Sequence, residues 1–272
     1  MTDRLTQFRW RVAEAGYTWK QIPDGSGSWF LTRPIDCSHR YNAPLKEQSG
    51  LYKTFASLPP KRPEILKFAD GFGLLGIGGP DTVTAEPSVW QEPLGIWVRE
   101  IRAMALAERV RQMLKQEPAD VRGLSTVISW EGPNGVYYTS PETGRPVAIA
   151  TKRRDPELLE RFDAGGLIVP ARVMLWRLIN DHLEGNVSGK LLFDPTYSRL
   201  NLYIVPKDLL SALWLQLARA VDGNRDFAQC EVCRNWFEIS SPDGARSDKR
   251  FCGTACRARA WRKAKAEEDK TK

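Results

Sequence analysis

Four cysteines near the C-terminus constrain this chain more than any other feature of its sequence. Two residues separate Cys230 from Cys233, three separate Cys252 from Cys256, and eighteen lie between the two pairs. Two such pairs can each wrap one side of a tetrahedral Zn²⁺, with Zn–S distances of about 2.3 Å. Because the protein fills all four positions, the spacing predicts one structural Zn²⁺ and leaves no coordination position for a substrate.

The alternative is four buried or incidental thiols with no metal. Four of the five cysteines in the chain fall within 27 residues, at the spacings of zinc knuckles, which favours the metal site. A metal site also suits a reducing compartment, and no stretch approaches the roughly 18 apolar residues of a bilayer-spanning helix. We therefore expect a cytoplasmic protein with no membrane partner. The roles of Cys37, His39 and His182 stay open.

Positive charge is concentrated around the second cysteine pair. Between residues 246 and 265 the chain carries eight Lys and Arg against one Asp, a net charge of +7 that equals the net charge of the whole chain. The rest of the chain is therefore near neutral, and attraction to a polyanion should come from this segment. The basic residues are Arg246, Lys249, Arg250, Arg257, Arg259, Arg262, Lys263 and Lys265.

This segment also has the composition of a helix. Cys252 and Cys256 are four residues apart, the spacing of one helix face, and the residues that follow are good helix formers. Lys and Arg near phosphates release counterions, and Arg can bind guanine bidentately in the major groove of duplex DNA. We therefore predict that all eight basic residues contact nucleic acid. The alternative is a solvated helix whose charge offsets the zinc–thiolate cluster.

The cysteine-rich segment resembles the bacterial CGNR-type zinc fingers. The shared features are a C-x2-C knuckle followed by Trp236 and Phe237, an Arg-rich stretch, an aromatic residue before the third cysteine and a basic helix. Residues 256 to 259 read Cys-Arg-Ala-Arg, which keeps the first and last residues of the CGNR signature and replaces the Gly-Asn between them. The resemblance implies a treble-clef finger with four cysteine ligands after an N-terminal α+β domain, in a DNA-binding transcription regulator.

A second likeness keeps a protein partner open. Phe251, Cys252, Cys256 and Arg257 are similar in spacing to a segment of small bacterial zinc proteins that bind and inhibit gyrase. The alternative function is therefore a protein-interaction module whose finger holds a partner such as a DNA-processing enzyme.

The remainder of the chain predicts an α+β domain. Apolar residues at spacings of three and four predict helices over residues 63–71, 93–116, 171–183 and 208–221. Short β-branched and aromatic runs over residues 124–130, 136–138 and 147–150 predict an antiparallel meander, and residues 190–193 and 200–205 predict two further strands.

The stop signal Asp222-Gly223-Asn224 places a domain boundary after residue 222. We thus expect an N-terminal α+β domain at 1–222 that senses a signal or forms a homodimer, a zinc finger at 223–266 and a charged tail at 267–272. With two histidines and no recognisable nucleophile or carboxylate motif, the sequence gives no support for an enzyme.

Overall fold

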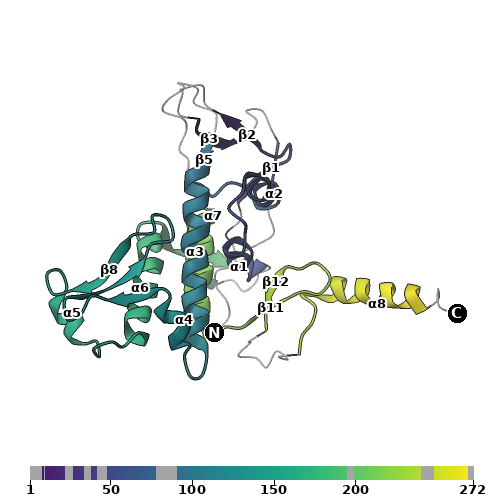
Figure 1. Ribbon diagram of the computed structural model, residues 1–272. Coiled ribbons are helices and arrows are strands. Elements are labelled where there is room, and N and C mark those ends of the chain that lie inside the picture. The colour runs from purple at the N-terminus through teal and green to yellow at the C-terminus, as the bar shows by residue number, and fades with distance from the viewer. Residues whose placement is uncertain are drawn as a thin grey trace.

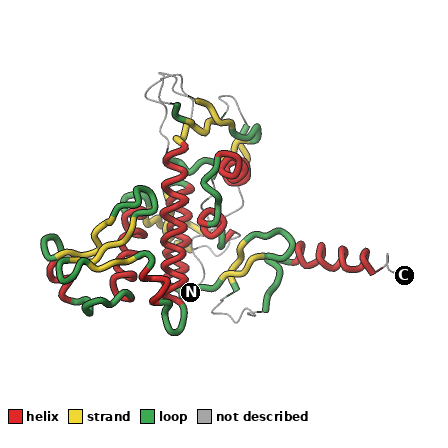
Figure 2. Tube along the Cα trace, in the orientation of Figure 1, coloured by secondary structure: helices red, strands yellow, loops and turns green. Residues whose placement is uncertain are grey.

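The computed structural model describes residues 8, 10–21, 27–33, 38–41, 48–77, 91–194, 199–239 and 248–268. Helices and small antiparallel sheets make up the described chain, which confirms the predicted α+β class. Figures 1 and 2 show a body built around one long upright helix, with the last helix projecting away from it.

The long helix is α3, which spans Leu94–Lys115. Pro93 immediately precedes it with an extended backbone, φ −61° and ψ 139°, so the helix begins at Leu94. Trp97, Ile101, Met104 and Val110 are all buried, so the 3-4 spacing seen in the sequence is the buried face of this helix. The predicted helix over residues 93–116 is confirmed, and α3 packs against four other helices.

Seven further helices are described, and they range from five to sixteen residues. They are α1 (Leu51–Ala56), α2 (Arg62–Phe72), α4 (Val121–Ser125), α5 (Pro156–Glu160), α6 (Ile168–Leu183), α7 (Leu209–Asp222) and α8 (Thr254–Glu268). Helices α2, α6 and α7 match predicted helices, whereas α1 and α4 were missed.

The described strands form small antiparallel sheets. Two-stranded sheets join β1 (Arg11–Ala13) to β4 (His39–Tyr41), β9 (Val187–Asp194) to β10 (Arg199–Pro206), and β11 (Phe227–Gln229) to β12 (Trp236–Glu238). One three-stranded sheet has the order β2 (Thr18–Gln21), β3 (Trp29–Thr32), β5 (Gln91–Pro93). A second three-stranded sheet has the order β6 (Ile128–Trp130), β7 (Gly135–Thr139), β8 (Pro146–Thr151). The last of these is the predicted meander.

One expected strand begins later than its sequence suggests. The apolar run was predicted to be extended from Leu124, but Leu124 lies in α4 and the strand starts at Ile128. Asp120 accepts a hydrogen bond from the backbone N–H of Gly123 and caps the helix, and the helix buries Leu124 completely. A capping side chain therefore outweighs the strand preference of the run.

Buried side chains gather in two clusters. The larger extends from Trp10 to Ala220 and joins α1, α2, α3, α6 and α7. The smaller consists of Cys230, Phe237 and Cys256, with Val232 and Phe251 packed against it. In the described ranges, no helix combines the length and the apolar character that crossing a membrane requires.

Candidate metal centre and its basic helix

The first cysteine pair lies in the turn between β11 and β12. Phe227 pairs with Glu238 and Gln229 pairs with Trp236, so the hairpin closes directly around this turn. Within it, the N–H of Cys230 donates to the carbonyl of Asn235 at 2.9 Å, and the N–H of Arg234 donates to the carbonyl of Cys230 at 2.9 Å. Arg234 has φ 62°, in the left-handed region, which lets the chain reverse tightly enough to bring two thiols together.

The second pair comes from the start of α8. Cys256 lies in the first turn of this helix, whereas Cys252 lies two residues before it begins at Thr254. The expectation that both cysteines share a helix face is therefore wrong for Cys252. The first turn of α8 therefore carries one of the two cysteines, and the chain just before the helix carries the other.

The four sulfur atoms converge on one point. All four lie within 4.8 Å of one another, and the Sγ of Cys252 is 3.6 Å from both the Sγ of Cys233 and the Sγ of Cys256. A tetrahedral site of four sulfurs with Zn–S bonds of about 2.3 Å requires sulfur atoms about 3.8 Å apart. The arrangement therefore fits Zn²⁺, and the separations are far too long for a disulfide of about 2.05 Å.

The electrostatics of the four thiols favour a bound cation. Burial raises the pKa of Cys230, but backbone N–H groups of Cys233, Cys252 and Val232 outweigh burial and lower this pKa to about 6. Burial and the neighbouring thiols raise the pKa of Cys252. Four thiolates so close together repel one another without a cation, and a divalent metal removes this repulsion.

The described basic residues outside α8 differ in whether an acidic side chain pairs with them. Arg246 lies outside the described residues. Lys249 is exposed, with its Nζ 5.8 Å from the centre of the Phe237 ring. Arg250 binds Glu231 through two hydrogen bonds of 2.6 and 2.7 Å. Glu231 therefore offsets the charge of Arg250, a pairing across nineteen residues that the sequence did not reveal.

The five basic residues within α8 are all exposed to solvent, and they are Arg257, Arg259, Arg262, Lys263 and Lys265. Figure 1 shows α8, in yellow, projecting away from the body of the protein. Sequence reasoning missed Trp261, which is 65% exposed on the same helix. Its i, i+4 spacing from Arg257 and Lys265 places these three residues on one stripe, and the Nζ of Lys265 lies 5.4 Å from the Trp261 ring.

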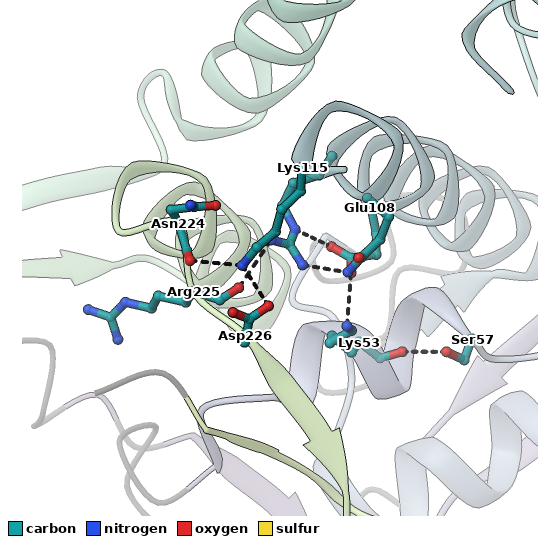
Figure 3. Close-up of polar contacts among 9 residues, drawn as sticks. Lys53, Ser57, Glu108, Lys115, Asn224, Arg225 and Asp226 are labelled. Atoms are coloured by element: carbon teal, nitrogen blue, oxygen red, sulfur yellow. Dashed lines mark hydrogen bonds and ion pairs between the residues drawn. The ribbon is translucent and has the colours of Figure 1, made fainter. Parts of the chain in front are cut away.

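The finger, by which we mean residues 227–239 and 248–268, is joined to the body by a network of polar contacts (Figure 3). Lys115 donates to the carbonyl of Asn224 at 2.9 Å and pairs with Asp226 at 2.6 Å. Lys53 pairs with Glu108 at 3.0 Å, and its Nζ lies 4.4 Å from the centre of the Trp236 ring of β12. The β11–β12 hairpin of the finger therefore rests on α1, and the segment leading into it, residues 224–226, contacts α3.

The remaining candidate residues do not join the metal centre. His39 lies beside Arg33, with 2.8 Å between Nε2 and Nη1, and burial together with the Arg33 charge lowers the pKa of His39. His182 pairs with buried Glu100 at 3.1 Å and stacks on Trp214. Cys37 lies outside the described residues. Within the ranges that the structure describes, the four cysteines are the one cluster with metal-binding geometry.

Comparisons of the chain with protein-family models, with curated proteins and with solved structures give no match. The metal centre is therefore assigned from its own geometry. Four cysteines within metal-binding distance are compatible with a zinc finger, and the sequence likeness to the CGNR type stays a resemblance.

Proposed function

We propose that this protein is a zinc-containing DNA-binding protein, and that it acts as a transcription regulator of the kind the CGNR resemblance implies. In this proposal four cysteines hold one structural Zn²⁺, and the ion fixes the start of α8. The observation that carries the proposal is an exposed basic helix that projects from the metal centre.

The shape of α8 supports binding to duplex DNA. The major groove is about 12 Å wide and admits one α-helix with its side chains. Helix α8 has fifteen residues, and in Figure 1 most of its length lies clear of the body, so the body does not block its approach to a groove.

The side chains of α8 support the same partner. The helix offers five cationic residues, and counterion release makes each phosphate contact favourable at low salt. Trp261 adds an exposed aromatic surface beside Arg257 and Lys265 that can pack against sugars or bases. Arg250 is excluded from our set of contact residues, because phosphate binding would have to break its paired hydrogen bonds to Glu231.

The test compares two triple variants that remove equal charge. In the first, Arg257, Arg259 and Arg262 are replaced by Ala. In the second, the exposed Lys152, Arg153 and Arg154 are replaced by Ala; they follow the β6–β8 sheet, which lies on the other side of α3 from α8 in Figure 1. Affinity of the full-length protein for a labelled random-sequence duplex is measured at several salt concentrations.

We expect the α8 variant to bind at least about tenfold more weakly, with a salt slope shallower by about 0.9 for each phosphate that the variant no longer neutralises. The control variant should bind like the parent. Zinc content should match in all three proteins, because none of the replaced residues is a ligand. Equal affinity of the parent and the α8 variant at every salt concentration would remove α8 as the DNA surface and would favour the protein-partner alternative.

A further inference from the structure

The β9–β10 hairpin exposes large apolar side chains to solvent on one of its two faces. Along β10, Asn201 and Tyr203 are buried, whereas the alternate residues Leu200, Leu202 and Ile204 are 46 to 61% exposed. Side chains alternate between the two faces of a strand, so the outward face of β10 is uniformly apolar.

The partner strand completes the same face. Leu191 lies directly opposite Leu202, and Phe193 lies directly opposite Leu200. Residues directly opposite each other in an antiparallel pair share a face, and both β9 residues are about 60% exposed. The outward apolar face therefore consists of Leu191, Phe193, Leu200, Leu202 and Ile204.

The size of this face indicates an interaction surface. With about 150 to 200 Å² per large side chain, the exposed fractions leave on the order of 400 to 600 Å² of apolar surface. Patches of this size are at the upper end for a monomer and often mark a binding site. Two strands alone are also marginally stable, and among the described residues β9 and β10 pair only with each other.

We propose that this outward apolar face is the interface of a symmetric homodimer. Two-fold symmetry places the same patch on both sides, so the patch must be complementary to itself. The face meets this condition because it bears no charged side chain, whereas a patch of one charge would repel its copy. Two copies packed about 10 Å apart form a small sandwich of two hairpins.

The buried area sets the strength of the dimer. Covering both patches removes on the order of 1,000 Å² from water, which is at the lower limit of specific interfaces. The dimer should therefore be reversible, with dissociation in the range of about 1 to 100 µM. Because the interface is apolar, added salt should not weaken it, in contrast to DNA binding by α8.

Sedimentation equilibrium of the full-length zinc-loaded protein, without nucleic acid, tests the proposal. In one variant, Leu191→Thr and Leu202→Thr remove the central apolar pair. Thr favours strands, so the hairpin should persist. The control is Trp176→Gln on α6, because Trp176 is exposed to the same 59% as Leu202 but belongs to another element.

We expect a concentration-dependent dimer for the parent and for Trp176→Gln, and at least about a tenfold higher dissociation constant for the Thr variant. Far-ultraviolet circular dichroism should match for all three proteins. A parent that stays monomeric to about 100 µM would overturn the proposal, as would a Thr variant that dimerises like the parent. Neither result bears on DNA binding by α8, which is measured separately.

Discussion

Gly50 lies directly against the backbone of β12. A Cβ added to Gly50 would come within 2.5 Å of the Trp236 Cβ and 2.7 Å of the Trp236 carbonyl carbon. The φ of Gly50 is −102°, which any residue adopts, so only the close approach requires glycine here. The position thus reports on the contact between α1 and the finger.

We predict that Gly50→Ala lowers the free energy of unfolding by about 2 kcal/mol, since the extra methyl group must push the finger away. Gly95→Ala is the control. Nothing lies within 4 Å of a Cβ at Gly95 in α3, and alanine is the better helix former there by up to about 1 kcal/mol. Chemical denaturation should show changes in the free energy of unfolding of opposite sign for the two variants. Changes of the same sign would contradict the contact at Gly50.

Glu108 is the buried anion that pairs with Lys53 and Arg111 where the finger meets the body. Burial raises its pKa, but hydrogen bonds from Arg111 and Gln112 and the charge of Lys53 outweigh burial and hold the pKa below its ordinary value of 4.5. Two hydrogen bonds of 2.7 and 3.1 Å connect it to Arg111, whose Nη1 also donates to the carbonyl of Arg225. Loss of this anion leaves two cations without their buried counterion.

We therefore predict that Glu108→Gln costs about 3 kcal/mol of stability at neutral pH. Because the pKa of Glu108 is lower in the folded than in the unfolded state, its ionised carboxylate stabilises the folded protein. This contribution is complete above about pH 4.5 and is lost as the pH falls through the folded-state pKa. The difference between parent and Glu108→Gln should hence shrink below about pH 4.5. A difference that stays constant down to about pH 3, measured by denaturant unfolding, would show that the carboxylate charge is not what stabilises the junction.

The residues that sequence could predict are those whose signal is local. The four cysteines stand at fixed short spacings, so their convergence was readable without a structure. The Glu231–Arg250 pair, the Gly50 contact and the Lys53 contact with Trp236 join residues far apart in the chain. Nothing in their immediate neighbours marks them, and only the fold brings them together.

Helices and strands were likewise predictable where their sequence signal is local. The helices α3 and α7 were predicted to within two residues at each end, because each carries several buried residues at helical spacing. Helix α1 was missed because it has only six residues and no capping side chain, so it is too short to show a period. The face of the β9–β10 hairpin also escaped sequence analysis, since a run such as Leu200 to Val205 does not say which alternate residues are buried.

Helix α8 differs from the others in what holds it. Its residues are mostly exposed, and within the described chain its buried residue is Cys256. Isolated helices of about fifteen residues are marginal in water. Its order should therefore depend on the metal, and in hydrogen exchange we expect residues 254–268 to lose their protection on chelation while α3 keeps most of its own. Unchanged protection of α8 after complete zinc removal would contradict this dependence.

At the scale of the whole molecule, the finger rests on the body through the Lys53, Glu108 and Lys115 network, and α8 extends beyond it (Figures 1 and 3). The predicted boundary after residue 222 follows the end of α7, and contacts from residues 224–226 continue across it to α3. The sequence showed the stop signal but could not show these contacts, because they depend on how α3 packs against α7.

The central claim is that zinc positions a basic helix that binds duplex DNA. Its most direct test is the affinity of the full-length protein for a labelled duplex across a salt series, measured zinc-loaded, after chelation and after zinc is returned. The loaded protein should give a linear fall of log affinity with log salt, with a slope of about −0.9 for each phosphate neutralised. Chelation should weaken binding by at least about tenfold, because α8 loses the anchor that orders it, and returned zinc should restore it. Affinity that does not change with salt, or that is the same with and without the metal, would contradict the account.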